Sequence, residues 1–254
     1  MALSWTVKRQ LFYFSIIVAI FLSIGVFAWL KITAPTCSDG RQNQKEEGVD
    51  CGGPCAKECV VNVKDLYVLW AKPLKVKDGA YDAVAMVENN NLNFSAPVAR
   101  YQFKFYDDKN ILVATRDGQT FITPGPKFAV FEPGIDTKFR IPVRAVLEFE
   151  KDLKWQKYKD LPLSVVVASK DYTDSPRPFL KAVLSNRSAE SAVGVYAVGL
   201  VYDKEGNAIA SGATNLNKID GGKSEEIFFT WPQSFGEGAD SNEILFRFRS
   251  VKNF

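Results

Sequence analysis

The sequence predicts an all-β chain in which two tandem β-sandwiches follow a single N-terminal transmembrane helix and a small disulfide module. Three observations lead to this fold class. One uncharged run lies near the N-terminus, all four cysteines fall within one short segment, and from Val60 onward apolar residues recur with a period of two between Gly- and Pro-rich turns. The predicted parts are a cytoplasmic tail (1–10), a transmembrane helix (11–32), a cysteine-rich module (33–59), and sandwiches at 60–170 and 171–254.

The run from Leu11 to Leu30 contains no charged residue. About 20 helical residues cross the roughly 30 Å hydrocarbon core of a bilayer. Lys8 and Arg9 precede the run, so the positive-inside bias keeps the N-terminus in the cytoplasm and places the C-terminal ectodomain outside the cell membrane. A cleaved signal peptide is the alternative, but its apolar region has about 7–15 residues and ends in a small-x-small site. The longer run favours a retained single-pass anchor.

The composition argues against several classes of function. The chain has 254 residues, a net charge of +3 and no histidine. Ser-His-Asp catalysis, Cys-His catalysis and His-ligated zinc or haem are therefore excluded. Lys and Arg are scattered among acids rather than gathered in a basic stripe, so we expect no nucleic-acid partner. No catalytic residue stands out, and we expect a protein that is not an enzyme.

Four cysteines occupy a short segment with the spacing C-x13-C-x3-C-x3-C. Outside the cytoplasm such a cluster most simply forms two disulfides, for which three connectivities are possible. Zinc held by four thiolates is the alternative, because C-x3-C pairs fall within the usual spacing of structural zinc sites. The oxidising compartment favours disulfides. The cysteines are Cys37, Cys51, Cys55 and Cys59.

Between the cysteines lie four side chains with hard oxygen donors: Asp39, Asn43, Glu46 and Asp50. Calcium binds six to eight such oxygens, so calcium is a possible cofactor here, although the spacing is not that of an EF-hand. The alternative is that Asp39 opens a turn, Asn43 and Asp50 bond their own backbone, and Glu46 is solvated. The residue types favour this alternative, and otherwise we expect no cofactor.

The same segment has the pattern C-x-D-G-x-x-N-x-x-E-x-x-x-D-C-G-G-x-C from Cys37 to Cys55. It resembles a short cysteine-rich segment that recurs in secreted and surface proteins of bacteria and archaea. Lys45 stands where that segment commonly has a small or acidic residue. The resemblance implies a surface-exposed linker module rather than an enzyme.

Strict alternation of apolar and polar residues predicts strands with one buried and one solvated face at 100–106, 138–143 and 244–249. A further apolar strand runs from Leu163 to Ser169, and we assign it to the first sandwich. In the three alternating strands the predicted buried side chains are Tyr101, Phe103, Phe105, Phe139, Ile141, Val143, Ile244, Phe246 and Phe248. Arg247 and Arg249 are predicted to lie on a solvated face.

The body of the chain repeats with an offset of about 97 residues, the size of one small sandwich domain. Asn89 precedes the pair Tyr106-Asp107 by a polar stretch and a strand, and Asn186 precedes Tyr202-Asp203 in the same way. An aromatic strand follows later in each copy, at 139–141 and at 227–229.

The segment Phe103-x-Phe105-Tyr106-Asp107, with Asn89 before it and Pro133-Gly134 after it, resembles an FxLYD-type domain. These domains are small immunoglobulin-like sandwiches of bacterial and archaeal envelope proteins, related in pattern to water-stress domains. The resemblance implies the same fold here. Phe105 replaces the Leu of the signature, and the second copy has Gly199 in place of the Phe. We expect the Asp of each copy to cap a turn and the Asn to bond the backbone.

These observations predict a membrane-anchored surface protein whose sandwiches contact other envelope proteins or act as an envelope spacer. A carbohydrate- or calcium-binding module is one alternative, which exposed aromatic rings at Phe121, Phe128 and Phe131 would favour. We prefer the interpretation that these three rings pack beneath the loop near them. A subunit of a larger envelope assembly is the other alternative.

Overall fold

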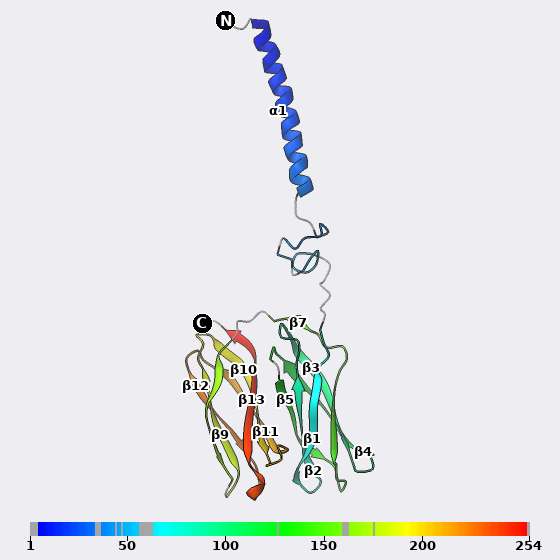
Figure 1. The fold of residues 1–254 in the computed structure, drawn as a ribbon, viewed down its shortest axis with the longest axis vertical. Coiled ribbons are helices and arrows are strands. Elements are labelled where there is room, and N and C mark those ends of the chain that lie inside the picture. The colour runs from blue at the N-terminus through cyan, green and yellow to red at the C-terminus, as the bar shows by residue number, and fades with distance from the viewer. Residues whose placement is uncertain are drawn as a thin grey trace. The chain divides into compact units, whose positions relative to one another are not determined.

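The structure is a computed structural model, and it describes residues 5–33, 37–43, 45–46, 48–55, 63–125, 127–158, 163–174 and 176–252. It is mostly β, with one N-terminal apolar helix (Figure 1). The chain divides into two compact units, residues 1–62 and residues 63–254. The coarse fold class predicted from the sequence is therefore confirmed.

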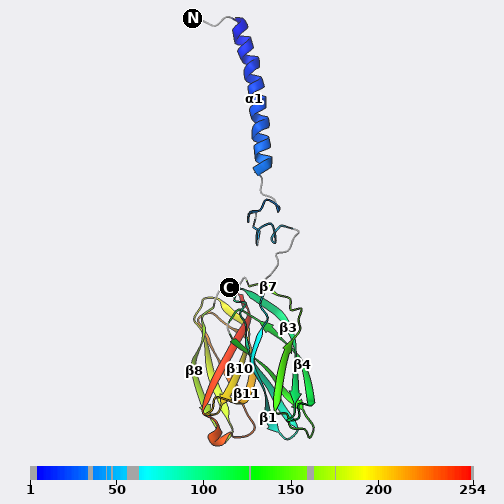
Figure 2. The same cartoon turned by 45° about the vertical axis from the view of Figure 1, so that its right-hand side comes forward.

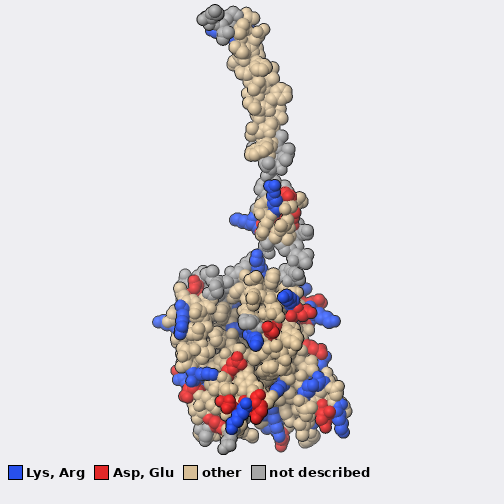
Figure 3. Space-filling view, in the orientation of Figure 1, with Lys and Arg blue, Asp and Glu red and all other residues tan. Residues whose placement is uncertain are grey.

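The helix α1 runs from Trp5 to Thr33. Its part from Trp5 to Phe27 is 23 residues long and apolar enough to cross a membrane. Figure 3 shows this part of the helix largely free of charged side chains. The Ser15 and Ser23 hydroxyls donate hydrogen bonds to backbone carbonyls one turn earlier, so neither needs water. The helix is thus compatible with the predicted anchor and begins six residues before Leu11.

The strands of residues 63–254 pair throughout in the antiparallel sense. Their bounds are β1 (Tyr67–Lys77), β2 (Ala80–Glu88), β3 (Phe94–Tyr106), β4 (Leu112–Ile122), β5 (Lys127–Asp136), β6 (Arg144–Phe149), β7 (Gln156–Lys157), β8 (Val165–Thr173), β9 (Phe179–Asn186), β10 (Ser191–Tyr202), β11 (Ala208–Ile219), β12 (Ser224–Thr230) and β13 (Ser241–Lys252), with a short 3-10 helix at Gly236–Gly238.

Two sheets enclose one core in the first half of this unit. The sheet β1-β2-β5 faces the sheet β4-β3-β6, and β7 pairs with the start of β3. Inward-pointing side chains of both sheets fill the space between them, among them Val87, Phe103, Phe105 and Val130. Phe103 and Phe105 are only 1% exposed, because alternate residues of the central strand β3 point inward.

The second half has the same strand order. The sheet β8-β9-β12 faces the sheet β11-β10-β13 around a core that includes Leu180, Leu184, Val195 and Phe229. Figures 1 and 2 show the two pairs of sheets side by side. A third apolar cluster joins them: Leu74, Val84, Met86 and Ala129 from the first half, and Val198 and Leu200 from the second. We call this contact region the junction.

The pairing corrects the predicted boundary between the halves. The strand from Leu163 to Ser169 was assigned to the first half, but β8 pairs with β9 along its length. Leu163, Val165 and Val167 accordingly pack on the second core. A boundary at 170/171 would cut β8, so Leu163 and all of β8 belong to the second half. Hydrogen bonding between strands determines to which half β8 belongs, and the sequence pattern of one apolar strand does not predict its partner strand.

Two further expectations are wrong. Residues 138–143 form no strand, and Phe139, Ile141 and Val143 are exposed rather than buried, because this segment passes around the end of a sheet instead of crossing its face. The first-half counterpart of the aromatic strand at 227–229 is therefore not at 139–141. Arg247, placed on a solvated face by its alternation, is buried at 6% exposure because that face of β13 meets the first half.

Candidate functional site

In the cysteine module, Cys37 and Cys55 form a disulfide. Cys51 is also disulfide-bonded, and Cys59 lies outside the described residues. The Sγ atoms of Cys37 and Cys55 and a carboxylate oxygen of Glu46 lie within 4.8 Å of one another. Because both sulfurs are used in the disulfide, this group offers no thiolate to a metal ion.

The four oxygen-bearing residues of the module lie together, and the three carboxylates among them accept hydrogen bonds from backbone N–H groups. Both carboxylate oxygens of Asp50 accept from the Gly40 N–H, and Asp39 accepts from the Arg41 N–H. Asn43 donates its amide to Asp39 at 2.8 Å. Glu46 is buried rather than solvated, and its Oε2 accepts from the Asn43 N–H at 3.1 Å. These contacts give each carboxylate a structural role, and a calcium site here stays a prediction.

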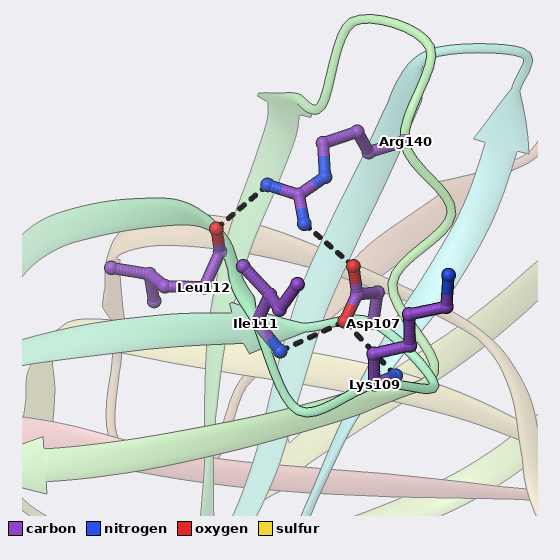
Figure 4. Close-up of polar contacts among 5 residues, drawn as sticks. All are labelled: Asp107, Lys109, Ile111, Leu112 and Arg140. Carbon is purple, nitrogen blue, oxygen red and sulfur yellow. Dashed lines mark hydrogen bonds and ion pairs between the residues drawn. The ribbon is translucent and has the colours of Figure 1, made fainter.

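Asp107 and Asp203 make the same set of hydrogen bonds at the ends of β3 and β10. Oδ1 of Asp107 accepts from the N–H groups two and four residues later, those of Lys109 and Ile111 (Figure 4). Oδ1 of Asp203 accepts from the N–H groups of Glu205 and Asn207 at 3.1 and 2.7 Å. Each aspartate therefore fixes the turn that leads into the next strand.

The turn at Asp107 carries an additional cation. Arg140 donates to Oδ2 of Asp107 at 2.5 Å and to the Leu112 carbonyl at 2.9 Å (Figure 4). Arg144 lies over the Tyr106 ring, 4.3 Å from its centroid. Hydrogen bonding from the Ile111 N–H, helped by the Arg140 guanidinium, lowers the pKa of Asp107 below its ordinary value. The turn is thus tied to the segment around Arg140.

We expect Asp107→Asn to remove stability that depends on pH. A carboxyl whose folded pKa lies below its unfolded value stabilises the fold above the unfolded pKa, about 3.9, and this contribution is lost as pH falls through the folded value. Urea denaturation at pH 7 should therefore show wild type more stable than Asp107→Asn, and near pH 3 the difference should shrink. A difference of equal size at both pH values would contradict this assignment.

Asn89 and Asn186 both bond backbone groups where a strand ends. Asn89 accepts from the Asn91 N–H at 2.9 Å and donates to the Thr123 carbonyl. Asn186 accepts from the Ser188 N–H at 3.0 Å and donates to the Glu190 and Ile219 carbonyls. Both side chains are buried, at 1% exposure. Each therefore satisfies backbone donors and acceptors beside the end of a strand.

Side-chain packing explains why position 199 is Gly. A Cβ at this position would lie 2.9 Å from the ring of Phe229, so the ring occupies the space that a larger residue would need. Phe103, at the same position along β3, fills its own core with its side chain. Tyr202 ends β10 as Tyr106 ends β3, and its hydroxyl donates to Glu243 at 2.9 Å.

Arg247 is the centre of the junction. Its Nε and Nη1 donate to the carbonyls of Phe121 and Ala129 at 3.1 and 2.9 Å, and its Nη2 donates to Oγ1 of Thr120 at 2.5 Å. The guanidinium carbon also lies 4.8–4.9 Å from the ring centroids of Phe121, Phe128 and Tyr196. A side chain of the second half is thus held by two carbonyls, one hydroxyl and two aromatic rings of the first half, and Tyr196 of its own half supplies the third ring.

Burial shifts the pKa values of two groups around the junction. It lowers the pKa of Arg247 to about 10, which still leaves the guanidinium charged at neutral pH. Burial, followed by the neighbouring Glu132, raises the pKa of Tyr101, whose hydroxyl donates to Glu132 at 2.8 Å. Carbonyl dipoles and ring faces replace the water that Arg247 loses. The arrangement is suited to holding the halves together.

The three aromatic residues considered for ligand binding do not form an exposed group. Phe121 and Phe128 are each 5% exposed, and Phe131 packs against the junction cluster. A pocket of about 260 Å³ opens beside them, lined in part by Glu132, Tyr196 and Arg249. It is smaller than the cavities that enclose drug-sized ligands.

Large apolar side chains are instead exposed around the Asp107 turn. Phe139 is 102% exposed and Ile141 is 68% exposed. The Val143 N–H donates to the Tyr106 carbonyl, and Arg140 bonds Leu112 and Asp107, so the segment runs beside the turn. We call these five exposed residues the tip patch: Ile111, Leu112, Phe139, Ile141 and Val143. Sequence reasoning missed this patch because alternation alone predicted a buried face.

No family model and no curated protein matches this chain. Among solved structures, the chain is similar to a transglutaminase of red sea bream, with 12% sequence identity and a TM-score of 0.22. The match covers 74% of this chain and 30% of the transglutaminase chain. A likeness this weak carries no argument about fold or activity.

Proposed function

We propose that this chain is a non-enzymatic, single-pass membrane protein whose β unit acts outside the cell membrane as a stiff surface spacer that contacts other envelope proteins. The observation that carries the proposal is the buried junction at Arg247 in a chain that also has an apolar N-terminal helix long enough for an anchor. A spacer must keep its parts in a fixed arrangement, and a buried cation shared between two halves opposes their separation.

We also propose that the two halves are FxLYD-type, immunoglobulin-like sandwiches that arose as a tandem repeat. The equal strand order of β1–β6 and β8–β13 supports this. The matching hydrogen bonds of Asp107 and Asp203 support it independently, because a turn of this kind depends on the position of the aspartate and not only on its presence.

The surface charge fits a protein partner better than a nucleic acid. Figure 3 shows Lys and Arg interspersed with Asp and Glu over the visible face of the β unit. Nucleic-acid binding draws on a continuous basic patch that neutralises phosphates. The aromatic residues that would favour a carbohydrate site, Phe121 and Phe128, are buried, so we do not advance that alternative.

A reporter fused after Phe254 tests the topology. Alkaline phosphatase, which folds only where disulfides form, should be active in this position, and the mature chain should keep its N-terminus near Met1. A fluorescent protein that requires the cytoplasm should be inactive at the same site. An active cytoplasmic reporter after Phe254, or a mature N-terminus beyond Thr33, would contradict the proposed anchor and orientation.

A further inference from the structure

The tip patch lies at the end of the first half that is remote from the point where the chain enters the β unit. The chain enters at Tyr67, which pairs with Glu88, whereas the Thr137 N–H donates to Gly79 in the turn at the opposite end of β1. β1 has 11 residues. At roughly 3.3 Å per residue, about 33 Å separates the two ends.

The patch is convex and carries cations beside its apolar side chains. Phe139 is fully exposed, so it protrudes and lines no groove. The seven residues from Lys138 to Arg144 include three cations and no acid. Arg140 is paired with Asp107, Lys109 and Asp108 of the adjoining turn add one charge of each sign, and Asp136 lies just before the segment. The patch and its surroundings therefore carry four cations and three acids, a net charge of +1.

We propose that the tip patch inserts into the interface of an anionic lipid bilayer. Protruding Phe and Ile side chains enter the region between headgroups and acyl chains without needing a shaped pocket, and Lys and Arg beside them attract anionic headgroups. A second copy of the chain fits less well, because Phe139 protrudes on both copies and finds no groove to enter on the other tip.

The segment from Lys138 to Arg144 is preorganised for contact with a membrane. Arg140 bonds Asp107 and the Leu112 carbonyl, so the backbone on both sides of the patch is fixed before binding. Little conformational entropy is then lost when Phe139 and Ile141 become buried. The inference rests on the proposed surface role only because that role places the β unit where it can meet a lipid surface. The reporter fusions test that role separately.

The experiment uses the full-length chain in phosphatidylcholine nanodiscs, mixed with vesicles and separated by flotation. Vesicles of phosphatidylcholine with phosphatidylglycerol should carry the protein upward, and vesicles of phosphatidylcholine alone should carry much less. The double variant Phe139→Ser/Ile141→Ser should weaken binding about tenfold or more. Lys109→Gln/Lys138→Gln should weaken it and make it less sensitive to salt.

Phe228→Ser is the matched control, because Phe228 is 51% exposed on β12 in the other half and should leave flotation unchanged. Thermal unfolding of each variant verifies its fold. Absence of flotation with anionic vesicles, or equal flotation of wild type and Phe139→Ser/Ile141→Ser, would overturn the proposal. Association with a purified protein that requires Phe139 while vesicles fail would also overturn it, in favour of a protein partner.

Discussion

Replacing Arg247 by Met is expected to destabilise the β unit by about 2–4 kcal/mol. The carbonyls of Phe121 and Ala129 lose their donors, and a buried acceptor without a partner costs about 1–3 kcal/mol. Met also gives up the contact of the cation with three aromatic rings. Urea denaturation of the full-length chain, followed by tryptophan fluorescence, measures the change.

Two variants make this result specific. Arg247→Lys should recover only part of the stability, because one ammonium group cannot donate along the three directions that the guanidinium fork reaches. Arg249→Gln should cost much less, about 0.5–1 kcal/mol, since Arg249 is exposed and gives up only its contact with the Phe121 ring. If Arg247→Met and Arg249→Gln proved equally stable, Arg247 would not be what holds the junction.

Replacing Asn186 by Ala is expected to cost about 2–3 kcal/mol, and Asn89→Ala a similar amount. Each truncation leaves buried backbone groups without partners: the Ser188 N–H and the Glu190 and Ile219 carbonyls for Asn186, and the Asn91 N–H and Thr123 carbonyl for Asn89. Chemical denaturation of each variant gives the two losses.

The exposed Asn217 on β11 supplies a control, because Asn217→Ala should change the stability by less than about 0.5 kcal/mol. If Ala lowered the stability strongly at only one of these two buried positions, the two asparagines would not have equivalent structural roles. That outcome would weaken the proposal that the halves are copies of one domain.

Local patterns in the sequence predicted much of the fold. Alternation in β3 and in part of β13 reflects one face turned to a core, and the run around Leu11 reflects a helix with no polar face. The turn chemistry of Asp107 and Asp203 is local as well, since each aspartate bonds N–H groups within four residues of itself.

What the sequence could not predict depends on contacts between distant segments. Arg247 bonds residues about 120 positions earlier, and nothing in its neighbours distinguishes it from the exposed Arg249. Phe139 and Ile141 alternate like a buried strand, but exposure is decided by where the chain turns at the end of the sheet. The apolar strand that begins at Leu163 was predicted to be buried, but its pattern does not indicate in which core, because β8 pairs with β9 through long-range contacts.

The two halves are expected to form one stiff body held by Arg247. Double electron–electron resonance tests it directly, with spin-labelled amino acids at the exposed positions Thr115 on β4 and Ser224 on β12 of the full-length chain. We expect one narrow distance distribution in wild type and a broader one in Arg247→Met. A broad or multiple distribution in wild type would contradict the claim.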